Sequence, residues 1–269
     1  MGMTRKSNKL EEQLLATRKP DLACGALIAS GTYGEKALKE YLNKIEALCQ
    51  LFKKSVFVTN GIIHPHSIRQ AHDMLNPLRQ GRGDINTATA LSNWLWSTKP
   101  KRYESQGNFR LTNVIDNQLD PSVERIGNCL GLTLLFNTLA YKIGLKAQAI
   151  HIEDTGDGPH VLSMLFFGHK KIDVENTLPT GFEYQGHLRN PRRELWGNRE
   201  LIADIYLSIG NESFEHNKPE EAIANYTKAI TLNHKYTKAY LNRGIALATL
   251  GQDKAATMDF NKHSGSYKY

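Results

Sequence analysis

Three residues in the middle of the chain, Cys129, His160 and Asp173, are of the types that together make an activated thiol. In such a site a cysteine attacks a carbonyl carbon, a histidine removes the thiol proton, and an acid orients the histidine ring. The three residues follow one another in that order along the chain. Taken alone, Cys129 is more simply interpreted as a small buried hydrophobic residue, because most free cysteines are buried.

Cys129 stands where a polar stretch changes into an apolar one. Asn128 is a good N-cap residue, which predicts Cys129 at the first helical position, and Gly144 is suited to the left-handed conformation that ends a helix. The residues between them are apolar on nearly all sides, which predicts a buried central helix. Unpaired N–H groups at a helix N-terminus carry about half a positive charge and therefore favour the thiolate.

Beyond this helix the hydrophobic period changes from helical to alternating or continuous, which predicts strands. The predicted strands are 147–152, 160–167 and 170–174, and the last two are joined by a turn at Gly168 and His169. A buried helix packed on an antiparallel sheet predicts an α+β core.

The hairpin between the last two predicted strands decides which acid reaches His160. With a two-residue turn, Met164 faces Asp173, and Asp173 points to the same side as His160. The same register leaves Asp173 about 13 Å along the strand from the residue opposite His160. Contact would require a turn centred nearer Phe166 or a bulge, and Glu175, on the same face, is the alternative acid.

These segments resemble the transglutaminase-like superfamily. Gly127-Asn128-Cys129-Leu130-Gly131 is similar to its Gly-x-Cys helix, Pro159-His160-Val161 to its histidine strand, and Ile172-Asp173-Val174-Glu175-Asn176-Thr177 to its aspartate strand. The resemblance implies a papain-like fold in which the Cys, His and Asp meet in a cleft. Members of the superfamily attack an amide and form a thioester that passes to an amine or to water, as transglutaminases, cysteine proteases or deamidases. Some members have lost catalysis, so an inactive interaction module is the alternative function.

The C-terminal part of the chain repeats at an interval of 34 residues. The pairs at that offset are Tyr206/Tyr240, Gly210/Gly244, Ala222/Ala256 and Tyr226/Phe260. This is the tetratricopeptide period, with small residues where two helices approach. Two repeats are fewer than a free solenoid needs, so we expect them to cap the core or to bind a protein partner. A transglutaminase-like core followed by such repeats resembles the bacterial SirB-type regulator family.

Together the patterns predict a polar N-terminal arm (1–20), a helical region (21–99), the transglutaminase-like core (100–190) and the tetratricopeptide repeats (195–269). Inside the helical region, the β-branched and aromatic residues from Val56 to Ile63 surround an Asn-Gly pair, which predicts a hairpin.

Composition and spacing argue against several other functions. The net charge of +7 comes from scattered residues, so we expect no nucleic-acid partner. No cysteine or carboxylate completes a metal-ligand spacing with His64, His66 and His72, and we expect neither a metal nor a cofactor. Three cysteines give no disulfide framework, and no run of about 18 apolar residues occurs. The first apolar run, Leu22 to Ala29, is short and late, so we expect no signal peptide. The sequence therefore predicts a cytoplasmic protein without a membrane partner. The resemblance to the transglutaminase-like superfamily implies that its substrate is a protein or peptide.

Overall fold

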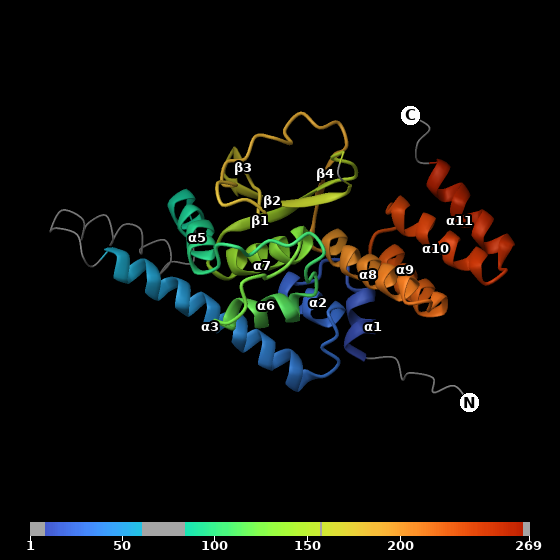
Figure 1. Ribbon diagram of the computed structural model, residues 1–269, viewed down its shortest axis with the longest axis horizontal. Coiled ribbons are helices and arrows are strands. Elements are labelled where there is room, and N and C mark those ends of the chain that lie inside the picture. Colours follow the sequence, from blue (N-terminus) through green and yellow to red (C-terminus); the bar gives the residue numbers. More distant parts are fainter. Residues whose placement is uncertain (1–8, 61–83, 157, 266–269) are drawn as a thin grey trace. The chain divides into compact units, whose positions relative to one another are not determined.

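The computed structural model describes residues 9–60, 84–156 and 158–265, which belong to two units of the chain (Figure 1). One unit comprises residues 34–197 and carries Cys129; we call it the site unit. The other joins the N-terminal residues up to Tyr33 to the residues from Asn198 onward, and we call it the helical unit. The expected region 21–99 is therefore divided between the two units.

In the described part of the site unit, a central helix contacts several others. The central helix is α7 (Cys129–Lys142), and the others are α3 (Glu35–Asn60), α5 (Ile85–Thr98) and α6 (Leu111–Leu119). Helix α7 is buried from Leu130 to Ala140 and contacts α3, α5 and α6. The prediction of a buried central helix that begins at Cys129 is confirmed.

A four-stranded antiparallel sheet packs against α7. Its strands are β1 (Lys146–Ile152), β2 (His160–Phe167), β3 (Lys170–Val174) and β4 (Arg193–Trp196), in the order β3-β2-β1-β4. The predicted combination of helices and an antiparallel sheet is confirmed. Strand β4 is absent from the sequence-based prediction, since its four residues are half charged and form no clear alternating pattern.

The sheet has two differently covered faces. Met164 pairs with Asp173, as the two-residue turn predicts. The apolar residues on the same face as this pair form a cluster that Phe166 and Tyr184 cover: Ile150, Ile152, Leu162 and Met164. Helix α7 contacts β1 and β2, and Thr133 of α7 donates a hydrogen bond of 3.2 Å to the Val161 carbonyl.

Residues Val56 to Asn60 continue helix α3, so the predicted hairpin is wrong for this segment. A helix that is already formed extends through β-branched residues, because propagation costs far less than nucleation and their helix propensity is only slightly reduced. Residues 61–83, which include His64, His66 and His72, lie outside the described residues.

The helical unit consists of α1 (Lys9–Ala16), α2 (Leu22–Ala29), α8 (Asn198–Glu215), α9 (Pro219–Leu232), α10 (Thr237–Thr249) and α11 (Asp253–Gly265). The same close approach occurs in both of its helix pairs. A Cβ atom added at Gly210 would lie 2.4 Å from the Tyr226 ring, and one added at Gly244 would lie 2.6 Å from the Phe260 ring. The 34-residue repeat is therefore a repeat of packing as well as of sequence.

Helix α1 is bound to the first of these pairs. Glu11 accepts hydrogen bonds of 2.9 Å from both the Tyr206 hydroxyl and the Lys228 ammonium group, and Leu14 is buried. From Lys9 onward, the expected polar arm is part of the helical unit.

Candidate active site

The start of α7 is held in place by capping and by two glycines. The Asn128 side chain accepts a 3.1 Å hydrogen bond from the N–H of Gly131, and its own N–H donates to the Asn108 carbonyl at 3.0 Å. A Cβ atom at either Gly127 or Gly131 would lie 2.4 Å from that same carbonyl oxygen. Glycine at both positions therefore lets the chain near Asn108 pass directly against the turn that carries Cys129.

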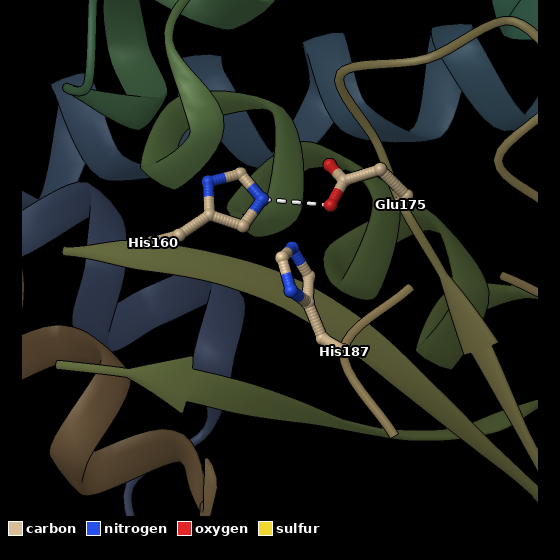
Figure 2. Close-up of side chains that lie close together, drawn as sticks. All are labelled: His160, Glu175 and His187. Atoms are coloured by element: carbon tan, nitrogen blue, oxygen red, sulfur yellow. Dashed lines mark hydrogen bonds and ion pairs between the residues drawn. The ribbon is translucent and has the colours of Figure 1, made fainter. Parts of the chain in front are cut away.

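His160 contacts Glu175 rather than the predicted Asp173. Figure 2 shows the two side chains facing each other, with His160 Nε2 at 2.7 Å from Glu175 Oε2. The Glu175 side chain is only 2% exposed, and its second oxygen accepts from the Thr177 N–H (3.0 Å) and hydroxyl (2.6 Å). Each carboxylate oxygen thus has a defined partner, which fixes the orientation of the carboxylate.

The thiol of Cys129 is close enough to the His160 imidazole to influence its pKa. Burial lowers the pKa of His160, but hydrogen bonds to Cys129 and Glu175, together with their negative charge, outweigh burial and raise it to about 10. Because Nε2 faces Glu175, the remaining ring nitrogen, Nδ1, is the one available to the thiol. A positively charged imidazole beside the sulfur stabilises a thiolate.

The Glu175 carboxyl remains ionised in spite of its burial. Burial raises its pKa, but the hydrogen bond and positive charge of His160 and the hydrogen bonds from Thr177 oppose this effect, and the net result is a lowered pKa. The site thus brings the thiol of Cys129, the imidazole of His160 and an ionised carboxylate together.

Asp173 has a different partner, and its predicted contact with His160 is wrong. Its Oδ1 accepts a 2.7 Å hydrogen bond from Arg193 Nη2, and its Oδ2 lies 2.6 Å from Arg193 Nη1. The register that pairs Asp173 with Met164 keeps it four positions from the residue opposite His160. Glu175 lies two positions closer and has a longer side chain, so it reaches the imidazole diagonally.

Asn176, to which the sequence analysis gave no role, connects the helix to the sheet. Its amide donates to the hydroxyls of Thr133 on α7 (3.1 Å) and Ser163 on β2 (2.8 Å). All three side chains are buried. This network holds α7 against β2 and therefore helps to set the position of Cys129 relative to His160.

Two further residues near the site were missed by the sequence analysis. The His187 ring lies 5.6 Å from the His160 ring, and burial followed by the positive charge of His160 lowers its pKa. Burial, followed by the negative charges of Cys129 and Glu175, raises the pKa of Tyr103. Ligand atoms of His160, Glu175 and His187 lie within 4.8 Å of one another, so these residues could hold a metal ion. Loop residues such as His187 follow no periodic pattern that would have indicated this contact.

Comparison with known proteins identifies a family only for the repeats. Residues 210–251 match the tetratricopeptide repeat, which is a protein-interaction module built on stacked helix pairs. No curated protein and no solved structure matches the chain. None of the helices in the described part of the chain is long and apolar enough to cross a lipid bilayer.

Proposed function

We propose that the site unit is a cysteine-dependent enzyme that acts on a peptide or side-chain amide through a thioester, as its resemblance to the transglutaminase-like superfamily implies. Cys129 is the nucleophile, His160 the base, and Glu175, in place of Asp173, the acid that orients the base. The observation that carries this proposal is the 2.7 Å contact of His160 Nε2 with the buried Glu175 carboxylate, which orients a ring whose pKa also responds to Cys129.

The three groups are suited to successive proton transfers. The Cys129 thiolate forms a bond to the amide carbon, and the protonated His160 gives its proton to the departing amine as the C–N bond breaks. Water or a second amine then loses a proton to the neutral imidazole and attacks the thioester. The C–S bond breaks, which restores the thiolate beside a protonated His160. Glu175 keeps the ring oriented and its charge balanced in both steps.

The N-terminus of α7 also supplies groups for the oxygen of the tetrahedral intermediate. The N–H groups of Cys129 and Leu130 lie in the first turn of α7, where helix geometry provides no acceptor four residues earlier. N–H groups at this position stabilise negative charge that develops on a carbonyl oxygen.

The repeats have a complementary role in this proposal. A tetratricopeptide pair attached to the site unit would bind the protein that carries the substrate amide and so raise its effective concentration near Cys129. The alternative is an inert site unit that supports a pair of interaction repeats, as in a SirB-type regulator.

Acylation by p-nitrophenyl acetate tests the proposal without knowledge of the natural substrate. We expect a burst of p-nitrophenolate and, by mass spectrometry, an acetyl group on Cys129 that hydroxylamine removes. Cys129→Ser and His160→Gln should abolish the burst, whereas Cys24→Ser should retain it. A burst of equal size in Cys129→Ser, or no acetyl group on Cys129 in the wild type, would support the inert alternative.

A further inference from the structure

The mechanism above gives no task to His187, although this second imidazole lies beside His160 and Glu175. One nitrogen from each histidine and one Glu175 oxygen all lie within 4.8 Å of one another. Figure 2 shows the three side chains converging from the start of β2, from the segment after β3 and from the loop that precedes β4. We propose that these three side chains bind Zn²⁺ and that the bound ion stops release of the acyl group from Cys129. The second half of this inference rests on the proposed function.

The ligand types and their spacing fit zinc. Two imidazoles and one carboxylate form a ligand set that zinc accepts, with the fourth position left to water. In a tetrahedral site with bonds of about 2.0–2.2 Å, neighbouring ligand atoms lie about 3.4 Å apart. His160 Nε2 and Glu175 Oε2, now 2.7 Å apart, would separate slightly. His187 would move toward them, and its place on a partly exposed turn between β3 and β4 permits this movement.

The surroundings of Glu175 favour its use as a ligand. Its Oε1 is held by the N–H and the hydroxyl of Thr177, while Oε2 points to His160. Hydrogen bonds of this kind orient a metal-binding carboxylate before the ion arrives. The buried negative charge of Glu175 also attracts a cation.

Zinc bound at this position would stop proton removal without contact with the sulfur. A neutral imidazole has a single free lone pair, on one of its two nitrogens. When zinc occupies the lone pair of His160 Nε2, the neutral ring carries its one proton on Nδ1. Nδ1 then cannot take the proton of the water or amine that attacks the thioester, so the bound ion and deacylation exclude each other.

Isothermal titration calorimetry of the full-length, metal-stripped protein with Zn²⁺ tests the site itself. The wild type should bind one ion, and His187→Gln should weaken that binding at least about tenfold. His169→Gln is the matched control, because His169 is exposed on the turn between β2 and β3, and its affinity should equal that of the wild type. Cys129→Ser should also keep its affinity, since the sulfur is not a ligand. Unchanged binding in His187→Gln, or lost binding in Cys129→Ser, would overturn the proposal and indicate ordinary coordination by Cys129 and His160.

Turnover of p-nitrophenyl acetate, with and without Zn²⁺, separates this inference from the proposed function. Zinc should slow steady-state release of p-nitrophenolate in the wild type and have little effect in His187→Gln at the same concentration. If zinc binds through His187 but Cys129 is not acylated even without it, the proposed function and the switch fail while the site stands. If Cys129 is acylated and zinc neither binds nor slows turnover, the zinc site is overturned while the proposed function stands.

Discussion

Two buried carboxylates at the end of β3, only two residues apart, have opposite surroundings. Asp173 is paired with the guanidinium of Arg193 on β4, which is a permanent cation. Glu175 is paired with the imidazole of His160 on β2, which can gain and lose a proton. Both carboxylates are about equally buried, with 2% of the side chain exposed, so burial does not distinguish them.

The difference shows that the partner determines the role of each acid. An arginine cannot deprotonate in a protein, and its pair with Asp173 can therefore only join β3 to β4. The pair of Glu175 with His160 also joins two segments, but it additionally fixes the ring whose pKa responds to Cys129. We therefore expect one pair to govern mainly stability and the other mainly reactivity.

The largest expected effect is a difference in turnover rate between variants of the two acids. Glu175→Gln should lower the rate of p-nitrophenyl acetate turnover by about 10²- to 10⁴-fold, because an amide neither stabilises the imidazolium nor holds its tautomer. Asp173→Asn is the matched change and should alter the rate by less than about threefold in protein that remains folded. Steady-state release of p-nitrophenolate measures both variants. Equal losses in the two variants would remove the distinction.

The free energy of unfolding should rank the same two variants in the opposite order, with the larger loss in Asp173→Asn. Asp173→Asn leaves the Arg193 guanidinium without its carboxylate and should cost about 3 kcal/mol. Glu175→Gln should cost about 1 kcal/mol, because the amide oxygen still accepts from Thr177. Urea unfolding followed by tryptophan fluorescence measures this in the site unit alone, since Trp94, Trp96 and Trp196 all belong to it. A smaller cost for Asp173→Asn than for Glu175→Gln would contradict the comparison.

Acidification extends the comparison to a second buried histidine of the site unit, His151. His151 stacks on Trp196, with ring centroids 3.9 Å apart, and burial followed by the charge of His160 lowers its pKa from 6.5 to about 4. Between these values the unfolded chain binds a proton that the folded state does not, so stability falls as pH falls from 6.5 to 4. The loss from this one group is up to roughly 3 kcal/mol.

In His151→Gln, the free energy of unfolding should fall less between pH 6.5 and pH 4 than in the wild type, and the difference should equal the contribution of His151. Urea midpoints measured at intervals from pH 7 to pH 4 provide the test, with the wild type as the reference. If the wild type and the variant have parallel profiles, His151 does not titrate as its surroundings require.

The smallest expected effect concerns the network that positions the two reactive groups. Thr133→Val removes a donor to the Val161 carbonyl and an acceptor for Asn176, and it should cost about 1 kcal/mol and slow Cys129 labelling a few fold. Thr138→Val on the same helix is the control, since the buried Thr138 hydroxyl has no hydrogen-bond partner within the described structure. That change should leave both quantities unchanged or slightly raise stability. Similar labelling rates in the two variants would mean that the network does not position Cys129.

The sequence predicts what depends on local spacing and fails where distant segments meet. The N-cap at Asn128 and the pairing of Met164 with Asp173 follow from residue types and the period of a strand. Whether Asp173 or Glu175 contacts His160 depends on a difference of only two positions along the chain. The pair of Asp173 with Arg193 also requires strand β4, whose four residues show no clear alternating pattern.

The contact of His187 was likewise hidden, because a loop carries no period from which a neighbour can be inferred. The repeats show the opposite case: Gly210 and Gly244 recur at a fixed offset, and so do the aromatic rings that they contact. A pattern that returns along the chain predicts packing, whereas a pair formed once between distant segments does not.

The most direct test of the central claim compares the alkylation rates of two cysteines in one protein. Cys129 and Cys24 are both partly exposed, so access alone does not favour either of them. With iodoacetamide at neutral pH, followed by mass spectrometry, Cys129 should react at least about tenfold faster than Cys24, because an adjacent imidazolium favours the thiolate. In His160→Gln the Cys129 rate should fall to that of Cys24, while the Cys24 rate stays constant. Equal rates in the wild type, or a Cys129 rate that does not respond to His160→Gln, would contradict the account.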